Sequence, residues 1–278
     1  MQRFLASFAL VAMLAGGPAF AAGKGRVLVL LSSETQLPLA SGPAYATGYY
    51  LNEFGVPADR LLKAGYELVP VTPRGNAASV DGNSVTPQYF GGDAAEMRRI
   101  ESVVAGLPAP RALDEVLAGD LDQYAGIFIP GGHAPLIDLA NNPRVGRLLA
   151  HFHARAKPTA AICHGPIALL SAQDDARGYE SALVAGRHPA AGHWLYAGYR
   201  MTIFSTPEEQ VFEGSLDGRR IRYYPAAAMA GAGGAMDFAP VWQPHVVVDR
   251  ELITGQNPFS DKALADAFIG HLEADAAR

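Results

Sequence analysis

Cysteine is almost absent from this sequence, because Cys163 is the only one among 278 residues. A lone thiol cannot close a disulfide within its own chain, which excludes a disulfide-stabilised scaffold. The eight histidines show no H-E-x-x-H spacing, and no second cysteine offers C-x-x-C, so the pattern does not support a structural metal site. The thiol is therefore buried and inert, links two chains, or takes part in chemistry.

Long apolar runs and basic runs are also scarce. The apolar stretch near the N-terminus, residues 4–14, is too short to span a bilayer, and no other stretch is longer and as apolar. The formal net charge is −5, and no run of lysine and arginine is long enough to follow a phosphate backbone. These absences argue against a membrane-spanning protein and against a nucleic-acid partner.

The first 21 residues have the layout of a secretory signal peptide. Arg3 precedes the apolar stretch, and small residues end it at Ala19-Phe20-Ala21. A buried first helix is the alternative. We expect cleavage after Ala21, export to the periplasm without a membrane anchor, and one domain over residues 22–278.

Short apolar runs without alternation predict strands that are buried on both faces of a parallel sheet. Segments of helical spacing lie between them, and this alternation predicts a doubly wound α/β fold with helices on both faces of the sheet. The expected strands are 26–31, 66–72, 125–130 and 159–162, and the expected helical segments are 47–64, 94–105, 143–156 and 166–171.

The pattern changes after residue 171. Residues 199–204 and 211–224 predict a strand and a hairpin at the edge of the sheet. Residues 225–240 are rich in alanine and glycine and favour neither helix nor loop, and their glycines do not form a dinucleotide-binding fingerprint. A last strand pair is expected over residues 245–255, followed by an amphipathic helix capped by Ser260.

Cys163 lies in "KPTAAICHGPIALL", at the joint between an expected strand and an expected helix. This position is typical of a nucleophile elbow, where the side chain stands exposed above the sheet and the first amides of the helix favour the thiolate. His164 is then a general base, an orienting group or a surface histidine. Gly131 and Gly132 end a neighbouring strand, so their N–H groups either stabilise an oxyanion with the amide of His164 or only shape a turn.

Three motifs resemble the ThiJ/PfpI superfamily, whose flavodoxin-like fold is shared with class I glutamine amidotransferases. They are "FIPGGHAPLIDLANNP", "AICHGPIALL" and "WQPHVVVDRELITGQNPFS", and the similarity runs from about Arg26 to the C-terminus. The chain is most similar to the branch of heat-shock chaperones and glutathione-independent glyoxalases. Ala134-Pro135 departs from the glycine that commonly follows "GGH" in this family.

The resemblance implies roles for particular residues. Cys163 matches the nucleophile and His164 its neighbour in a triad, while Glu53 matches a glutamate that is brought to the cysteine. The third triad member falls on Glu208 or Glu209, and Glu208 is preferred by position. Gly131, Gly132 and His133 match the segment that binds the oxyanion or the substrate.

The resemblance also implies a function. The leading hypothesis is a glyoxalase of the stress response that converts methylglyoxal and water to lactate through a cysteine thiolate, without glutathione, metal or other cofactor. Its partner would be a small carbonyl substrate, and a homodimer is one expected assembly, because many relatives dimerise. The alternatives are a cysteine-dependent amidohydrolase, and an exported holdase chaperone whose thiol senses oxidation.

Overall fold

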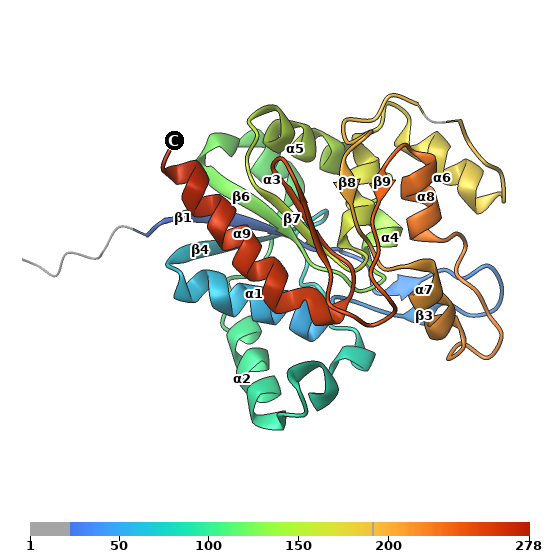
Figure 1. Cartoon of the computed structure of the whole chain (residues 1–278), viewed down its shortest axis with the longest axis horizontal. Coiled ribbons are helices and arrows are strands. Elements are labelled where there is room, and N and C mark those ends of the chain that lie inside the picture. The colour runs from blue at the N-terminus through green and yellow to red at the C-terminus, as the bar shows by residue number, and fades with distance from the viewer. Residues whose placement is uncertain (1–22, 191) are drawn as a thin grey trace, which may run out of the picture.

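The computed structural model describes residues 23–190 and 192–278, so the expected signal peptide lies outside the described residues. A seven-stranded sheet forms the centre, in the order β10-β11-β7-β6-β1-β4-β5 (Figure 1). Its neighbouring strands are parallel except for the β10–β11 pair. The bounds of the seven strands are β1 Gly25–Leu30, β4 Tyr66–Thr72, β5 Arg111–Ala112, β6 Tyr124–Ile129, β7 Thr159–Ile162, β10 Val246–Asp249 and β11 Leu252–Gly255.

Strand β1 lies inside the sheet, with β4 on one side and β6 on the other. The chain adds strands first in one direction and then in the other, which is the winding of flavodoxin-like sheets. The expected doubly wound fold is thus confirmed. In such sheets ligands bind beyond the carboxyl ends of the strands near this switch point.

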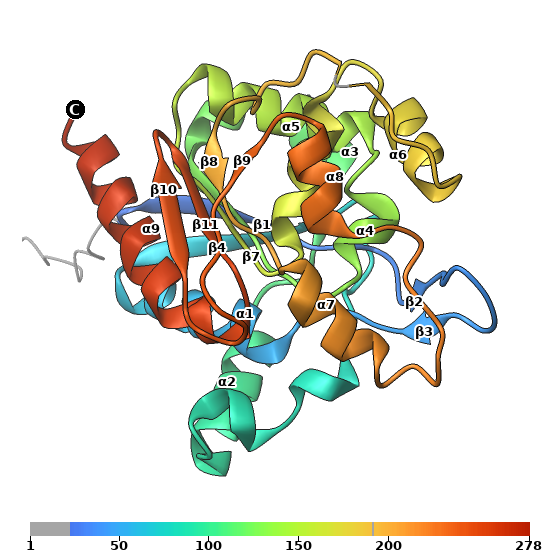
Figure 2. The ribbon, with the colours of Figure 1, turned by 45° about the vertical axis from the view of Figure 1, so that its right-hand side comes forward.

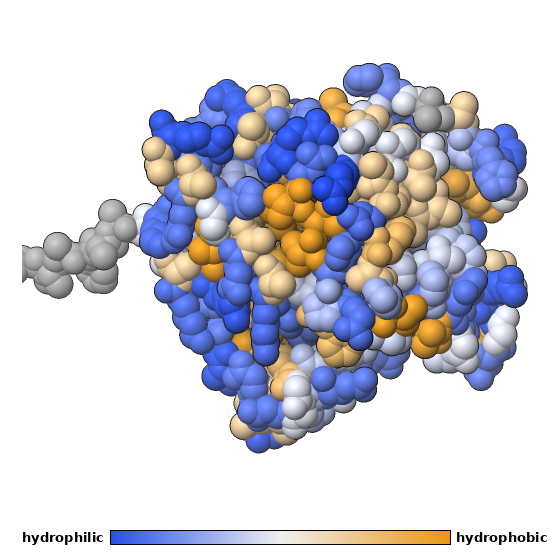
Figure 3. Space-filling model, in the orientation of Figure 1, coloured by the Kyte–Doolittle hydropathy of each residue, from blue (hydrophilic) through white to orange (hydrophobic). Residues whose placement is uncertain are grey.

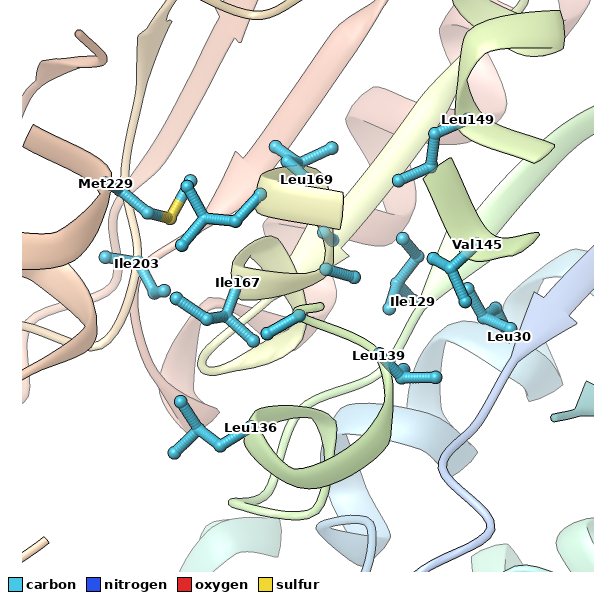
Figure 4. Packing of buried hydrophobic residues seen from close by; sticks show 14 of the residues in the cluster. Leu30, Ile129, Leu136, Leu139, Val145, Leu149, Ile167, Leu169, Ile203 and Met229 are labelled. Carbon is cyan, nitrogen blue, oxygen red and sulfur yellow. The ribbon is translucent and has the colours of Figure 1, made fainter. Parts of the chain in front are cut away.

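Two helical layers cover the sheet because alternate strand residues face opposite sides. Val27 and Val29 join a core with α1 (Leu51–Lys63) and α9 (Asp261–Ala276). Leu28 and Leu30 join a larger core on the other face, with α3 (Leu113–Ala118), α5 (Pro143–Ala154) and the 3₁₀ helix Gly165–Ala172. Figure 4 shows this larger core, where Leu30, Ile129, Val145 and Ile167 lie between strand and helix.

The remaining elements surround these layers. Helix α2 (Ala94–Ala105) packs on the outside of α1, away from the sheet (Figure 1). Four further helices lie in the segments that connect the strands: α4 (Pro135–Asp138), α6 (Ala176–Val184), α7 (Thr206–Glu213) and α8 (Pro225–Gly231). Two small sheets complete the fold, antiparallel β2–β3 (Gln36–Leu37, Tyr45–Ala46) and parallel β8–β9 (Arg200–Met201, Ala235–Met236). Among the described residues, no helix combines the length and apolar character that a membrane crossing requires.

The C-terminal half differs in part from the sequence prediction. The hairpin expected over residues 211–224 is wrong, because α7 continues to Glu213 and irregular chain follows it. The strand expected over residues 199–204 is reduced to β8, which pairs with β9 outside the main sheet. Residues 225–240, which favoured no structure, supply α8 and β9.

The final elements agree more closely with the prediction. The strand pair is confirmed as β10 and β11, and the closing helix as α9. Ser260 precedes α9, but its side chain does not cap this helix; its hydroxyl bonds to Asn257 instead. The helix expected after the cysteine is a 3₁₀ helix, Gly165–Ala172.

Candidate active site

Cys163 occupies a strained turn directly after β7. Its φ of 56° lies in the left-handed region, which costs a non-glycine residue roughly 1–2 kcal/mol. Two backbone hydrogen bonds hold it there: the Cys163 N–H donates to Gly255 (2.9 Å), and the Phe204 N–H donates to the Cys163 carbonyl (3.0 Å). The sharp strand-to-helix turn that was expected at Cys163 is present. The side chain, however, is not exposed as expected, since Cys163 is only 3% accessible.

His164 connects the cysteine to a buried carboxylate. Its Nδ1 lies 3.3 Å from Cys163 Sγ, and its Nε2 lies 2.7 Å from Glu209 Oε2. Because a carboxylate only accepts hydrogen bonds, the proton of a neutral His164 sits on Nε2, and Nδ1 is free to accept the thiol proton. The side chains therefore form a Cys–His–Glu triad in geometry.

The preference for Glu208 as the third member is corrected by the structure. Its carboxylate accepts hydrogen bonds from the backbone N–H and hydroxyl of Ser205, from Asn257, from Gln256 and from the Trp242 N–H. The bonds with Ser205 form a capping box at the start of α7, which turns Glu208 away from His164. The sequence S-T-P-E carried this signal, because an N-cap serine with glutamate three residues later is the capping-box pattern.

Glu53 lies on the first turn of α1, beside the cysteine. It is fully buried, and neither carboxyl oxygen has a hydrogen-bond partner of normal geometry among the described residues. Burial raises the pKa of Glu53 well above its usual value, while the Cys163 thiol and the Gly131 N–H oppose part of that rise. The shift favours the protonated form of Glu53, next to the thiol.

Burial also raises the pKa of the Cys163 thiol, and the charge of Glu53 would raise it further, while the Gly132 N–H acts in the opposite direction. The expectation that the first amides of the following helix favour the thiolate is thus not met, because the net shift is upward. The pKa of His164 is lowered by burial and by His133, against the influence of Glu209. These shifts favour the neutral forms of Cys163, Glu53 and His164.

Gly131 and Gly132 make room for this arrangement. A Cβ on Gly131 would lie 2.3 Å from Glu53 Oε2 and 2.6 Å from Cys163 Cβ. Gly132 has a φ of 87°, and a Cβ there would lie 2.1 Å from the Gly48 carbonyl oxygen. Glutamate and thiol can therefore meet only because residue 131 lacks a side chain.

His133 extends the triad by a second histidine. Its Nε2 lies 2.8 Å from Glu209 Oε1, so a single carboxylate holds both imidazoles, whose ring centroids are 4.0 Å apart. The two histidines lower the pKa of Glu209 although burial opposes this, and the carboxylate stays ionised. Ligand atoms of His133, His164 and Glu209 lie within 4.8 Å of one another, a spacing that a metal ion could also use. In the structure described, each carboxylate oxygen of Glu209 is within hydrogen-bond distance of an imidazole nitrogen.

The triad opens into a cavity of about 300 Å³. Its walls come from segments far apart in the sequence: the N-terminal end of α1, the loop before α2, α7 and the loop before β10 (Figure 2). Sequence reasoning missed the aromatic residues of these walls, because only folding brings them together. They are Tyr50, Tyr89, Phe204, Phe212 and Trp242.

Comparison with known proteins places this site in a family. Residues 44–180 match the model of the DJ-1/PfpI family. The chain is 28% identical over 260 residues to a protein/nucleic acid deglycase HchA from Staphylococcus aureus, covering 91% of this chain and 82% of the relative. It is also 28% identical over 247 residues to the deglycase HchA of Escherichia coli, covering 87% and 79%.

Solved structures share the fold. The glyoxalase III of Candida albicans superposes with a TM-score of 0.70 at 20% identity, covering 90% of this chain and 98% of that one. The elbow, the sheet order and these matches lead to one conclusion: the chain contains a domain of the DJ-1/PfpI family, also called ThiJ/PfpI.

Proposed function

We propose that this protein is a glutathione-independent glyoxalase that converts 2-oxoaldehydes and water to 2-hydroxy acids. The observation that carries the proposal is the contact set at Cys163, where a buried thiol meets a protonated glutamate on one side and the His164–Glu209 pair on the other. A thiol and two proton carriers are the groups that this internal redox reaction needs.

In the first step the sulfur of Cys163 adds to the aldehyde carbon, and its proton passes to Nδ1 of His164. The new S–C bond turns the aldehyde oxygen into an oxyanion of a hemithioacetal. The Gly132 N–H, which acts on the thiol in the free protein, is placed to stabilise that negative charge. The oxyanion then takes up the proton from His164.

In the second step the hydrogen on the former aldehyde carbon is removed as a proton, which leaves an enediol. Return of a proton to the adjacent carbon gives a thioester of the 2-hydroxy acid on Cys163. His164, neutral after the first step, carries this proton from one carbon to the other. Glu53 donates its proton to the ketone oxygen as the enediol forms, and takes a proton back from the other hydroxyl as the thioester forms. Water then cleaves the thioester, releases the hydroxy acid and restores the thiol, so methylglyoxal plus water gives lactate.

The enclosure of the nucleophile favours a small substrate over a peptide. Cys163 is 3% exposed at a cavity of about 300 Å³, whereas an extended peptide needs an open cleft along which the backbone can lie. The amidohydrolase alternative therefore receives less support from the structure than the glyoxalase.

The holdase alternative depends on a broad apolar surface. On the face shown in Figure 3, apolar residues form small patches separated by hydrophilic ones. The exposed large apolar side chains of the described residues are spread over several elements: Leu62, Val80, Val85, Val184, Val211, Phe238, Val241 and Val248. This distribution gives the holdase alternative less support than the glyoxalase.

The names of the relatives favour one second candidate. A deglycase would remove early 2-oxoaldehyde adducts from proteins or nucleic acids as 2-hydroxy acids, with the same thiol attacking the adduct carbon and the amine leaving. The two activities are separated by supplying either free methylglyoxal or a preformed adduct of N-acetylarginine, and by following lactate in both cases.

The test of the proposed function measures methylglyoxal consumption and lactate formation by purified protein without glutathione. Wild type should produce lactate, and Cys163→Ser and Glu53→Gln should each lose at least about a hundredfold in kcat/KM. Glu115→Gln, at an exposed acid on α3, is the control and should retain wild-type rates. Folded wild-type protein without turnover would refute the proposal.

A further inference from the structure

We propose that the preferred substrates are 2-oxoaldehydes with a flat, uncharged apolar substituent, such as an aryl group, rather than methylglyoxal. This inference rests on the proposed function and names the substrate class of the same site. It is carried by the size of the cavity, by the side chains that line it and by the way its tryptophan wall is held.

The cavity is larger than a three-carbon aldehyde requires. Its volume is about 300 Å³. A water molecule in the liquid takes about 30 Å³, so the space corresponds to about ten waters, whereas methylglyoxal displaces only a few. Bound at Cys163, methylglyoxal would leave most of the aromatic wall in contact with solvent. A phenyl substituent would fill that space.

The chemistry of the lining selects against charged substituents. Among the described residues, no aspartate, glutamate, lysine or arginine lines the cavity. The polar side chains away from the triad are those of Asn83 and Ser215 and the hydroxyls of Tyr50 and Tyr89. A cationic lysine or arginine adduct would lose its hydration there without gaining a countercharge. Aromatic rings instead offer faces and edges to a flat ligand.

The aromatic wall is fixed before any ligand binds. The rings of Tyr50 and Tyr89 pack edge to face with their centroids 5.5 Å apart, and the ring centroids of Trp242 and Phe204 are 5.6 Å apart. Phe212 stacks on His133 at 4.1 Å, which ties the wall to the triad. Rings that are already packed lose little freedom when a ligand binds, so their contact energy goes into affinity.

Trp242 is held in an unusual backbone conformation. Its φ of 62° lies in the left-handed region, and its backbone N–H donates to Glu208 Oε1 at 2.9 Å. The same carboxylate also binds Ser205 at the start of α7. Glu208 thereby joins the tryptophan wall to the helix that carries the triad acid. A strained residue kept in place by a fully buried carboxylate points to a position that matters for ligand binding.

The experiment compares phenylglyoxal with methylglyoxal as substrates, without glutathione, and subtracts the rates of the Cys163→Ala protein. For wild type we expect kcat/KM to be about tenfold or more higher for phenylglyoxal, as expected for an added apolar group that fills its pocket. Trp242→Ala should lower this ratio at least about fivefold, mainly through KM for phenylglyoxal. Tyr89→Ala, in the segment before α2 that also lines the cavity, should act in the same direction if the tryptophan variant folds poorly.

Phe238→Ala is the matched control, because Phe238 is an aromatic residue of the same loop that is 42% exposed and does not line the cavity. It should keep the wild-type ratio. A wild-type ratio near one, or a ratio that well-folded Trp242→Ala and Tyr89→Ala leave unchanged, would overturn the inference and leave the proposed function intact.

A binding measurement separates this failure from failure of the proposed function. Mandelate and lactate, the two hydroxy-acid products, are titrated into the Cys163→Ala protein by calorimetry. Mandelate binding at least about tenfold tighter than lactate supports the aryl pocket even if wild type turns over neither aldehyde. Equal affinities would refute it.

Discussion

Three buried glutamates have three different surroundings in this protein, and their surroundings determine what each can do. Glu53 has no hydrogen-bond partner of normal geometry among the described residues, and burial raises its pKa. Glu208 accepts several hydrogen bonds, and Glu209 lies between two histidines. All three are fully buried. A carboxyl group without partners is suited to proton transfer, and one with many donors is suited to structural support.

Glu209→Gln should therefore lower kcat by about 10²–10⁴-fold, because a neutral amide no longer stabilises protonated His164 or fixes its tautomer. Glu208→Gln should instead lower the free energy of unfolding by about 1–3 kcal/mol, since donors that now face the carboxylate would be left unpaired. Steady-state kinetics and urea unfolding of both variants test this division. Equal loss of kcat in two well-folded variants would show that the triad acid is misassigned.

Glu53 makes stability depend on pH. Its folded-state pKa is raised above the usual 4.5, so its contribution to stability is complete below about pH 4.5 and is lost as the pH rises through the folded pKa. Glu53→Gln removes this loss. The variant should match wild type at pH 4 and exceed it at pH 8 by about 1–3 kcal/mol.

Thermal unfolding at both pH values measures the effect of Glu53→Gln, with about 2–4 °C expected per kcal/mol. Glu115→Gln, at an exposed site, is the control and should give the same difference from wild type at both pH values. A stability gain for Glu53→Gln at pH 4 equal to that at pH 8 would contradict a raised pKa.

At the scale of elements, the close approach of α1 and α2 depends on Gly55. A Cβ on this residue would lie 2.2 Å from Ile100 Cγ2 and 3.2 Å from Val104 Cγ2. Because α1 also carries Glu53, the contact with α2 helps to fix the helix end that faces the cysteine. The packing of α2 against α1 thus helps to position Glu53 at the site.

We expect Gly55→Ala to destabilise the protein by about 1–3 kcal/mol, since overpacking exceeds the helix-propensity gain of about 1 kcal/mol. Gly270→Ala is the matched control in α9, where nothing lies within 4 Å of the added Cβ, and should stabilise by roughly 0.5–1 kcal/mol. Chemical denaturation of both variants tests the pair. Stabilisation by both substitutions would refute close packing of α1 on α2.

At the scale of the whole molecule, we propose that the protein is exported, and this proposal and the lone thiol can be tested together. Protein recovered from the periplasm should begin at Ala22 and contain one thiol that reacts after unfolding. Because Cys163 is 3% exposed, disulfide-linked dimers should not form in air. N-terminal sequencing and non-reducing electrophoresis measure both points. A chain that keeps its leader would refute signal cleavage, and a disulfide dimer would refute burial of the thiol in solution.

The parallel strands and their crossover helices could be predicted from the sequence, because an uninterrupted apolar run or a helical period is a local property. The same holds for the turn at Cys163, which chain order alone places after β7. The local pattern was misleading over residues 211–224. Its alternation predicts a hairpin, but the first of these residues belong to α7, a helix that begins at the capping box of Ser205 and Glu208. The S-T-P-E signal was present there and indicates a helix start.

The sequence by itself determined the winding of the sheet, the family motifs and the position of Cys163 on its turn, since each depends on residues close together in the chain. Only the tertiary structure decided that Glu209 rather than Glu208 meets His164, that Glu53 is buried against the thiol and that five aromatic residues enclose the cavity. The physical reason is that pKa values and cavity walls depend on burial and on neighbours from distant segments, and these exist only once the chain has folded.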